Sequence, residues 1–569
     1  MVKKILSFVG KEISGLHEAA YLLAGSAVAS LIFALVRDRL LAHFLGASSS
    51  LDVYYAAFRV PDFLFVTVAS LVSAAILVPF LIDNREKEAS GEVPAGDLRE
   101  SISSLFSAFS IIILATCAVA FLIMPFLDGL LFSNLVALGH GPLLVSMSRI
   151  LLLSPILLGL ASFFASLAQI RNRFIIYAFS SALYNVGIIF GILFFLPTIG
   201  VAGLAWGVAL GAAMFAAAQI PVVVRDGLFP RFVADFASRG NWKKIRRIIV
   251  LSIPRTITMS SQQITELGLI SFASFLSAGS ISIFNLAFNL QSVPLSIVGG
   301  SYSSAAFPVL AKLVAQKKRE EFLGKMIDAS KHVIFWSAPI MALFIVLRAQ
   351  IVRVILGSGQ FTWSDTRLTA AALALFVVSS FGQSLMLIFV RAFYAEGKTS
   401  KPLLINVVST IVTVILGFLL VKLFHSAPAF SSFVVSLMKT DGASDSSVLM
   451  LPLAFTLGAL LNMYLHWRAF SKEFPAFNKP VLATAWHSFA AAVVGGYAAY
   501  IGLVFFGPIF GLTTTFGVFM QGFLGGVIGI IVIYLTLKLL RSPELHEIHE
   551  AVRHKVWKVD KASLDKLPS

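Results

Sequence analysis

The sequence predicts an all-α polytopic membrane protein with about fourteen transmembrane helices. Hydrophobic residues make up 58% of the chain and charged residues 13%, and the mean hydropathy is +0.90, far above the range of soluble globular proteins. Apolar runs of about 20 residues, the length that crosses about 30 Å of hydrocarbon, recur along the chain. The predicted centres of these spans are Ala29, Val72, Leu114, Ile156, Gly187, Leu210, Gln262, Pro294, Ala338, Phe376, Val412, Leu457, Val493 and Ile528.

A weak internal repeat divides the predicted spans into two lobes. The segment LYNVGIIFGILFFL in the fifth span resembles LINVVSTIVTVILGFLL in the eleventh, which aligns Asn185 with Asn406, and GLAWGVALG resembles PLAFTLGAL one helix later. We therefore expect two pseudo-symmetric six-helix lobes plus two C-terminal helices, an organisation typical of alternating-access transporters. The predicted boundaries are 1–240 for the N-terminal lobe, 241–475 for the C-terminal lobe, 476–541 for helices thirteen and fourteen, and 542–569 for a cytoplasmic amphipathic basic tail.

The distribution of lysine and arginine predicts the orientation. Most of these residues fall in loops on the same side as the N-terminus, and the positive-inside rule places such loops in the cytoplasm. Both termini are therefore expected to be cytoplasmic, and the net charge of +16 indicates topology and attraction to anionic membrane lipids, not nucleic-acid binding. The opposite loops hold Arg348, Arg353, Arg367, Lys422 and Lys439.

Metal and redox chemistry have no support in the sequence. The single cysteine, Cys117, excludes an intramolecular disulfide framework. The tail contains His546, Glu547 and His549, but this spacing lacks the i, i+4 histidines of the zinc motif H-E-x-x-H. The N-terminus shows no pattern of a removable signal peptide. We therefore expect no metal and no cofactor. Four glycines in the last span predict a close helix-packing face: Gly522, Gly525, Gly526 and Gly529.

Charges inside the predicted spans point to a polar cavity. Each costs about 2.5 to 3.5 kcal/mol on membrane-insertion scales, so it should face protein, water or the interface. Arg149 is best explained as an arginine whose long side chain extends to the lipid headgroups. We expect one hydrated cavity to be lined by Arg37, Arg59 and Arg255, with Asp38 steadying Arg37. Several arginines around one cavity would suit a diphosphate, because guanidinium groups bind phosphate oxygens bidentately. The full set is Arg37, Asp38, Arg39, Arg59, Asp62, Arg149, Arg255 and Glu266.

Several of these residues fall in motifs that resemble a known family. The segments VRDRLLAHFLGASSSLDVYYAAFRVPDFLF, ILGSGQFTWSDTRLTAAAL and VRAFYAEGKTSKP resemble the MurJ (MviN) lipid II flippases of the MOP transporter superfamily. The resemblance covers nearly the whole chain. It implies two six-helix lobes plus two extra helices, and movement of an undecaprenyl-diphosphate-linked peptidoglycan precursor from the inner to the outer leaflet of the bacterial cytoplasmic membrane. It also implies a lipid-linked diphosphate substrate, membrane lipids and cell-wall synthesis proteins as partners.

The resemblance carries over to the site residue by residue. Arg37, Asp38 and Arg59 match family positions expected to line the central cavity, and Asp52 matches a further family position. The chain also departs from the family. Ser70 replaces a glutamate, Asn289 takes the place of an arginine, and the cation-linked pair of Asn and Asp becomes Asn406 and Thr410. By hypothesis Arg255 supplies the missing cation, and Glu266, Asn406 and Thr410 are candidates for ion binding or gating.

Two other functions stay open at this point. A flippase for another polyprenyl-linked oligosaccharide would fit the departures, and so would a non-transporting membrane scaffold. An enzyme is not expected, because no pair of nucleophile and base, metal cluster or phosphate-binding loop emerges. Loss of the cavity arginines discriminates between the classes, since a scaffold should tolerate it and a flippase should not.

Overall fold

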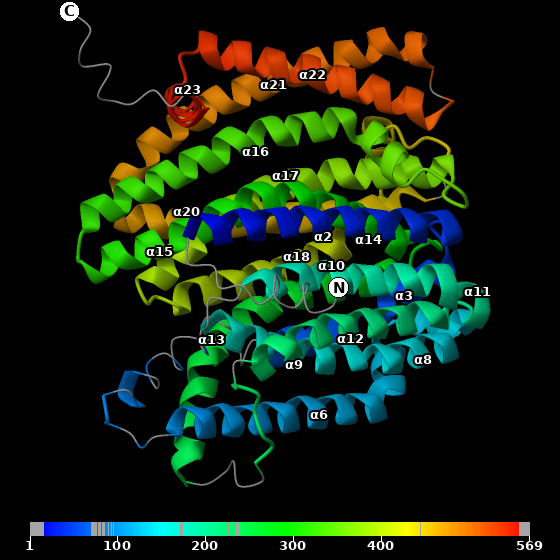
Figure 1. Cartoon of the computed structure of the whole chain (residues 1–569). Coiled ribbons are helices and arrows are strands. Elements are labelled where there is room, and N and C mark those ends of the chain that lie inside the picture. Colours follow the sequence, from blue (N-terminus) through cyan, green and yellow to red (C-terminus); the bar gives the residue numbers. More distant parts are fainter. Residues whose placement is uncertain are drawn as a thin grey trace, which may run out of the picture. The chain divides into compact units, whose positions relative to one another are not determined.

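The computed structural model consists of helices joined by short connections (Figure 1). It describes residues 16–69, 77, 81, 83, 86–88, 90–92, 94, 96–170, 174–225, 227–233, 239–443, 445–511 and 513–556. The chain separates into two compact units. Unit 1 comprises Met1–Leu286, Leu356–Asp365 and Asn406–Lys422, and unit 2 comprises Ala287–Ile355, Thr366–Ile405 and Leu423–Ser569. The predicted lobes, 1–240 and 241–475, follow the internal repeat and stay a prediction.

The first part of the chain supplies most of unit 1. Its α-helices are α2 (Leu16–Leu45), α3 (Ser49–Ala57), α4 (Arg59–Ala69), α6 (Asp97–Leu131), α7 (Ser133–Leu135), α8 (Gly141–Leu151), α9 (Leu153–Ile170), α10 (Phe174–Phe190), α11 (Leu196–Ile199), α12 (Ala202–Arg225) and α13 (Arg239–Ala273). The first half of α14 (Ser280–Pro294), the segment Leu356–Asp365 and the middle of α18 (Ser400–Ser426) complete the unit.

The second part of the chain supplies most of unit 2. Its remaining α-helices are α15 (Ser301–Ala315), α16 (Arg319–Ile355), α17 (Trp363–Ala395), α19 (Pro428–Met438), α20 (Met450–Glu473), α21 (Asn478–Phe510), α22 (Thr515–Leu539) and α23 (Pro543–Val556). Short π- and 3-10 segments join some of these helices: Val136–His140, Gly191–Phe195, Leu295–Gly300, Ser446–Leu449 and Pro475–Phe477.

The all-helical membrane fold is confirmed. Within the described residues, 11 helical segments are long and apolar enough to cross a membrane, and each contains one of the predicted centres. The other three centres are Ala29, Gln262 and Val72. Ala29 lies in the 30-residue helix α2 and Gln262 in the 35-residue helix α13, whereas Val72 lies outside the described residues. The total of fourteen therefore stays a prediction.

Glycines let two helices of unit 1 touch along their backbones. A Cβ on Gly187 would lie 2.3 Å from the Cα of Gly211, and one on Gly191 would lie 2.4 Å from the Cα of Gly207. Gly207 and Gly211 are one turn apart on α12, while Gly187 lies on α10 and Gly191 begins the π segment that continues it, so the two helices approach more closely than any side chain permits. This contact explains the repeated glycines in the fifth and sixth spans, and it gives α10 a rigid partner.

Connections at one end of unit 1 interlock. Gly46 has φ +61°, and a Cβ there would lie 2.6 Å from the carbonyl oxygen of Gln360. Gly359 has φ +57°, and a Cβ there would lie 2.3 Å from the carbonyl oxygen of His43. The Gln360 N–H donates to this same His43 oxygen at 2.9 Å. The Gly46-Ala47 turn and the segment GSGQF, residues 357–361, therefore meet in one close backbone contact, which requires glycine at Gly46 and Gly359.

Asp52 joins α3 to the start of α14. Its carboxylate accepts the backbone N–H of Gly279 at 2.6 Å, the backbone N–H of Ser282 at 2.7 Å and the Ser282 hydroxyl at 2.6 Å. These are N–H groups that a helix N-terminus leaves without intrahelical partners. Asp52 is 3% exposed. The family-matched aspartate is thus a buried helix cap that holds the helix carrying Asn285 in place.

In unit 2 the predicted glycine-rich face is confirmed and has two sides. Figure 1 shows α21 and α22 side by side. Gly525 and Gly529 approach α21, where a Cβ on either would lie 3.2 Å or less from a backbone carbonyl oxygen or a side-chain atom. Gly522 and Gly526 face α16, with a Cβ 2.9 Å from Gln350 and 3.2 Å from Leu347, respectively. The small residues therefore pack three helices together.

The C-terminal helix α23 packs onto unit 2. Its residues Leu545 and Ile548 lie against a buried cluster that includes Phe335 and Ile533, so this apolar face contacts the protein itself. Glu544, in the first turn, is 2% exposed and accepts hydrogen bonds from the hydroxyls of Thr484 and Ser542. The sequence also predicts Val552, Val556 and Val559 near this helical face, but the side chains of Val552 and Val556 are not described and Val559 lies outside the described residues.

Candidate functional site

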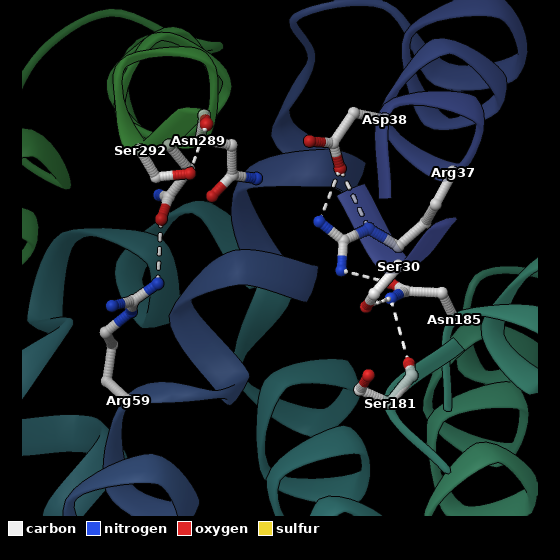
Figure 2. A network of polar contacts seen from close by, with 9 residues as sticks. Ser30, Arg37, Asp38, Arg59, Ser181, Asn185, Asn289 and Ser292 are labelled. Carbon is white, nitrogen blue, oxygen red and sulfur yellow. Dashed lines mark hydrogen bonds and ion pairs between the residues drawn. The ribbon is translucent and has the colours of Figure 1, made fainter. Parts of the chain in front are cut away.

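Arg59 is the centre of a buried polar cluster in unit 1. It begins α4, directly after a turn at Phe58, and is 8% exposed. Its NH1 donates to Glu266 Oε2 on α13 at 3.1 Å, its NH2 to Asn285 Oδ1 on α14 at 2.7 Å, and its Nε to the Tyr55 carbonyl at 3.2 Å. Figure 2 shows Arg59 extended toward α14. One guanidinium group therefore ties α4 to two helices more than 200 residues away, at sequence separations of 207 and 226.

The partners of Arg59 are held by their own hydrogen bonds. The Asn285 amide donates to the Ile281 carbonyl at 2.7 Å, and the Gln262 amide donates to the second oxygen of Glu266 at 3.2 Å. Glu266 is 7% exposed and Asn285 is 5% exposed. Because an unpaired buried charge is strongly destabilising, by about 3 to 5 kcal/mol when one partner is removed, both charges depend on this arrangement.

Arg37 forms a second cluster with the residue that follows it. Its Nε and NH2 contact Asp38 Oδ1 at 2.9 and 2.8 Å, so the expected steadying of Arg37 by Asp38 is present. Its NH1 donates to Asn185 Oδ1 on α10 at 3.1 Å. The Asn185 amide in turn donates to the Ser181 carbonyl at 3.2 Å and to Ser30 Oγ at 3.5 Å, as Figure 2 shows. The side chain of Arg37 is 19% exposed, while Asp38 is 2% exposed.

Tyr55 adjoins the Arg59 cluster and lies between Arg37 and Arg59 in the sequence. Its backbone carbonyl accepts the Nε–H of Arg59 at 3.2 Å. The residue is 7% exposed, and its hydroxyl has no hydrogen-bond partner among the described residues. Sequence reasoning missed Tyr55. The available signal was its position one helical turn before Arg59, in the segment YYAAFR. Its free hydroxyl makes it a further candidate for contacting a ligand between the two clusters.

The candidate ion or gating residues have separate environments. Thr410 on α18 donates to the Ser261 carbonyl at 3.0 Å and lies 3.1 Å from the Thr265 hydroxyl, so it joins α18 to α13. Asn406, one turn earlier, is 8% exposed. Glu266 does not lie free in a cavity, because it is the partner of Arg59. The Thr410 hydroxyl is thus engaged in helix packing beside the Arg59 cluster.

Two of the predicted residues are not brought into these clusters by the described contacts. Arg255 lies on α13, but its side chain is outside the described part of the structure. Asn289 lies on α14, one turn after Asn285, and belongs to unit 2, where its carbonyl accepts the Ser292 hydroxyl at 2.6 Å. Ser70 lies outside the described residues. The asparagine that contacts Arg59 is Asn285, and the i, i+4 spacing of two asparagines in FNLAFN was the signal for it.

Comparison with known proteins finds one family along most of the chain. The family model described as "Lipid II flippase MurJ" matches residues 41–519. The probable lipid II flippase MurJ of Buchnera aphidicola subsp. Schizaphis graminum is 27% identical, over 72% of this chain and 78% of that protein. The lipid II flippase MurJ of Burkholderia cenocepacia is 25% identical, over 72% of this chain and 80% of that protein.

Solved structures share the fold. A lipid II flippase MurJ in an inward closed conformation aligns with a TM-score of 0.71 at 20% identity, covering 91% of this chain and 99% of that chain. An inward-facing multidrug resistance MATE family transporter of the MOP superfamily aligns with a TM-score of 0.61 at 15% identity, covering 79% of this chain and 96% of that chain.

Proposed function

The chain belongs to the MurJ family, and from this we propose that it is a lipid II flippase, which moves an undecaprenyl-diphosphate-linked peptidoglycan precursor from the inner to the outer leaflet by alternating access. It is a multi-pass membrane protein with the fold of MOP-superfamily transporters. Such a protein is a transporter and not an enzyme. Its transport would supply peptidoglycan synthesis, and so cell-wall biogenesis and cell shape, from the bacterial cytoplasmic membrane.

The observation that carries this proposal is the buried guanidinium of Arg59. A diphosphate cannot cross hydrocarbon unaided, because an isolated charge there costs tens of kcal/mol by Born estimates. A flippase must replace the lost hydration with fixed donors. Arginine suits this role because it stays charged in any environment and presents paired N–H groups that match phosphate oxygens. Arg59 offers such donors from inside a membrane helix bundle, at 8% exposure.

The contacts of Arg59 suggest how the diphosphate would bind. Its NH1 and NH2 now donate to Glu266 and Asn285, which are oxygen acceptors like phosphate. Phosphate oxygens would take over these donors one for one, so no buried N–H would be left unsatisfied, and the cost of leaving Glu266 and Asn285 without Arg59 would keep the affinity moderate. In the same way, the N–H groups of Arg37 would donate to phosphate oxygens in place of Asp38 and Asn185. The unpaired hydroxyl of Tyr55 would add a further hydrogen bond to the diphosphate.

The same exchange would link binding to movement. The Arg59–Glu266 ion pair connects α4 to α13, so a diphosphate that captures Arg59 would release one of the bonds between these helices. Glu266 would then act as a gating residue, beside the Thr410 contact that holds α18 to α13. Solved MATE transporters of this superfamily include inward-facing and outward-facing conformations, so the fold supports rocking of the two lobes. We assign Arg255, Asn289 and Asn406 supporting roles on the substrate and ion paths.

The orientation is part of the proposal. With both termini in the cytoplasm, the exposed connection at Lys317 between α15 and α16 would also be cytoplasmic. A cysteine placed at this position in a Cys117→Ser background should react with a membrane-impermeant label only after the cells are opened. Labelling in intact cells would contradict the orientation.

The decisive experiment measures translocation by arginine variants. In proteoliposomes with labelled lipid II, Arg59→Ala should abolish translocation and Arg59→Lys should impair it, with thermal unfolding showing that both proteins are folded. Arg367→Ala removes a half-buried arginine that donates to the Lys439 carbonyl and serves as the matched control. A folded triple variant with alanine at Arg37, Arg59 and Arg255 that still complements loss of a flippase would overturn the mechanism.

The same assay separates the alternative functions. If the protein is a flippase for another polyprenyl-linked oligosaccharide, the wild type would not translocate labelled lipid II. Its activity on that other substrate would be lost in Arg59→Ala. The replacement of a family arginine by Asn289 is the feature that favours this alternative. A scaffold would tolerate Arg59→Ala in complementation tests.

A further inference from the structure

Two apolar grooves meet at Arg149 on the surface of unit 1. The Trp206 groove, about 580 Å³, is lined by α6, α8, α9 and α12, and includes Leu114, Ala118, Leu122, Ile156 and Trp206. The Ser146 groove, about 640 Å³, is lined mainly by α6 and α8, and includes Pro125, Pro142, Val145 and Ser146. Phe121, Arg149 and Ile150 line both. Along α6 the Trp206 groove spans residues 114–122 and the Ser146 groove 121–125, so one follows the other along the helix.

Arg149 is held at this junction but only partly engaged. Its Nε donates to the Phe121 carbonyl at 3.1 Å, and its guanidinium carbon lies 4.6 Å from the centre of the Phe121 ring. Within the described part of the chain, its two terminal amino groups have no hydrogen-bond partner and it forms no salt bridge. Asp128 interacts electrostatically with Arg149. The Asp128 carboxylate is fully buried, and neither of its oxygens has a hydrogen-bond partner among the described residues, so it forms no hydrogen bond with Arg149.

The residues that line the two grooves indicate which kind of ligand would bind there. Among the described residues that line the two grooves, Arg149 is the only charged one. The Trp206 groove is entirely apolar apart from Arg149, Trp206 and Cys117, whereas the Ser146 groove adds an exposed hydroxyl. Leu114 and Phe121 are separated by about 10 Å along α6, at 1.5 Å per residue, which accommodates a stretch of extended hydrocarbon. A ligand that fits has one anionic group and an adjoining hydrocarbon chain.

We propose that this junction is a binding site for an anionic glycerophospholipid, with the phosphate on the terminal N–H groups of Arg149 and an acyl chain in the Trp206 groove. The guanidinium fork presents two parallel donors to two phosphate oxygens. The headgroup lies toward the Ser146 groove, where the hydroxyl is available. A phospholipid with no net charge fits less well, because its cationic headgroup would leave the charge of Arg149 uncompensated. The site is separate from the Arg59 and Arg37 clusters and does not rest on the proposed function.

The test is native mass spectrometry of the purified full-length protein titrated with phosphatidylglycerol or phosphatidylcholine. The wild type should bind phosphatidylglycerol about tenfold more tightly, which corresponds to about 1.4 kcal/mol. Arg149→Ala should lose this preference, and Arg149→Lys should keep part of it, because lysine retains the charge without the fork. Equal affinity of the wild type for the two lipids, or an unchanged preference in Arg149→Ala, would overturn the site.

Variants of the groove test the acyl chain independently of the charge. Ala118 is exposed and lines the Trp206 groove, so Ala118→Trp should lower the affinity for both lipids with Arg149 intact. Ala115→Trp is the matched control, since Ala115 is exposed on the same helix and lines a different groove without a charged residue. Arg348→Ala controls for loss of a membrane arginine, because Arg348 lies on α16 and lines neither groove.

Competition distinguishes a phospholipid from the transported lipid. Excess undecaprenyl diphosphate should leave bound phosphatidylglycerol in place. Displacement would instead assign the grooves to the substrate path and overturn the proposal. If Arg149→Ala does not fold, Arg149→Lys and Ala118→Trp decide the outcome, and an effect of Ala115→Trp equal to that of Ala118→Trp would contradict the site.

Discussion

Neutralising Glu266 should tighten substrate binding and slow transport. In the structure its carboxylate lies 3.1 Å from the Arg59 guanidinium, and both side chains are about one tenth exposed, at 9% and 10%. A charge-assisted hydrogen bond in such a site contributes about 1.5 to 3 kcal/mol, whereas a neutral one contributes about 0.5 to 1.5 kcal/mol. Glu266→Gln therefore weakens the internal competitor for Arg59 by about 1 to 1.5 kcal/mol, or roughly tenfold in affinity for a diphosphate.

The assay measures the affinity for lipid II and the rate of translocation with the same purified protein. Binding of labelled lipid II to purified Glu266→Gln should be about tenfold tighter than to the wild type, and its translocation in proteoliposomes should be slower, because the carboxylate no longer helps to displace the diphosphate. Glu396→Gln is the matched control, since Glu396 pairs with Lys398 outside this cluster. Unchanged or weaker binding by a folded Glu266→Gln protein would refute the exchange of acceptors at Arg59.

Three further outcomes concern stability. Asp52→Asn should lower the free energy of unfolding by about 1 to 3 kcal/mol in thermal or denaturant unfolding, because an amide cannot accept three hydrogen bonds as the carboxylate does; an unchanged midpoint would contradict its role as a cap. Gly207→Leu should prevent folding or lower stability by more than about 3 kcal/mol, since its Cβ would lie 2.6 Å from the Cα of Gly191, whereas Gly129→Leu, in α6 with open space at its Cβ and an ordinary helical φ, serves as control. Burial alone would raise the pKa of Glu544, but hydrogen bonds from Thr484 and Ser542 and the nearby Lys331 outweigh it and hold the pKa below its ordinary value of 4.5. This carboxylate therefore stabilises the packing of α23 above its unfolded pKa, and that contribution is lost as the pH falls through the lower folded pKa. The protection factors of the α23 amides, which are exchange rates corrected for the intrinsic pH dependence of exchange, should fall in this acid range in the wild type but stay flat with pH in Glu544→Gln.

The sequence predicted the candidate arginines better than their partners. Arg37 beside Asp38 was visible because the residues are neighbours. Asn185 was singled out only as one half of the internal repeat, and its contact with Arg37 emerged from the packing of α10 on α2. Glu266 was expected as an ion or gating residue but pairs with Arg59. Asn285 and Tyr55 were not found, because neither side chain carries a charge that would mark it within an apolar span.

What the sequence by itself determined is the class of the protein: a helical, polytopic membrane chain with glycine-packed helices, buried charges and the motifs of one transporter family. These properties follow from local composition, since hydrocarbon thickness sets the length of a span and every in-span charge must find a polar partner. Only the tertiary structure decided which partner each charge finds. The bonds from Arg59 to Glu266 and Asn285 join residues 207 and 226 positions apart. Such pairings depend on how helices rotate and cross when they pack, and no local pattern of residues carries that information.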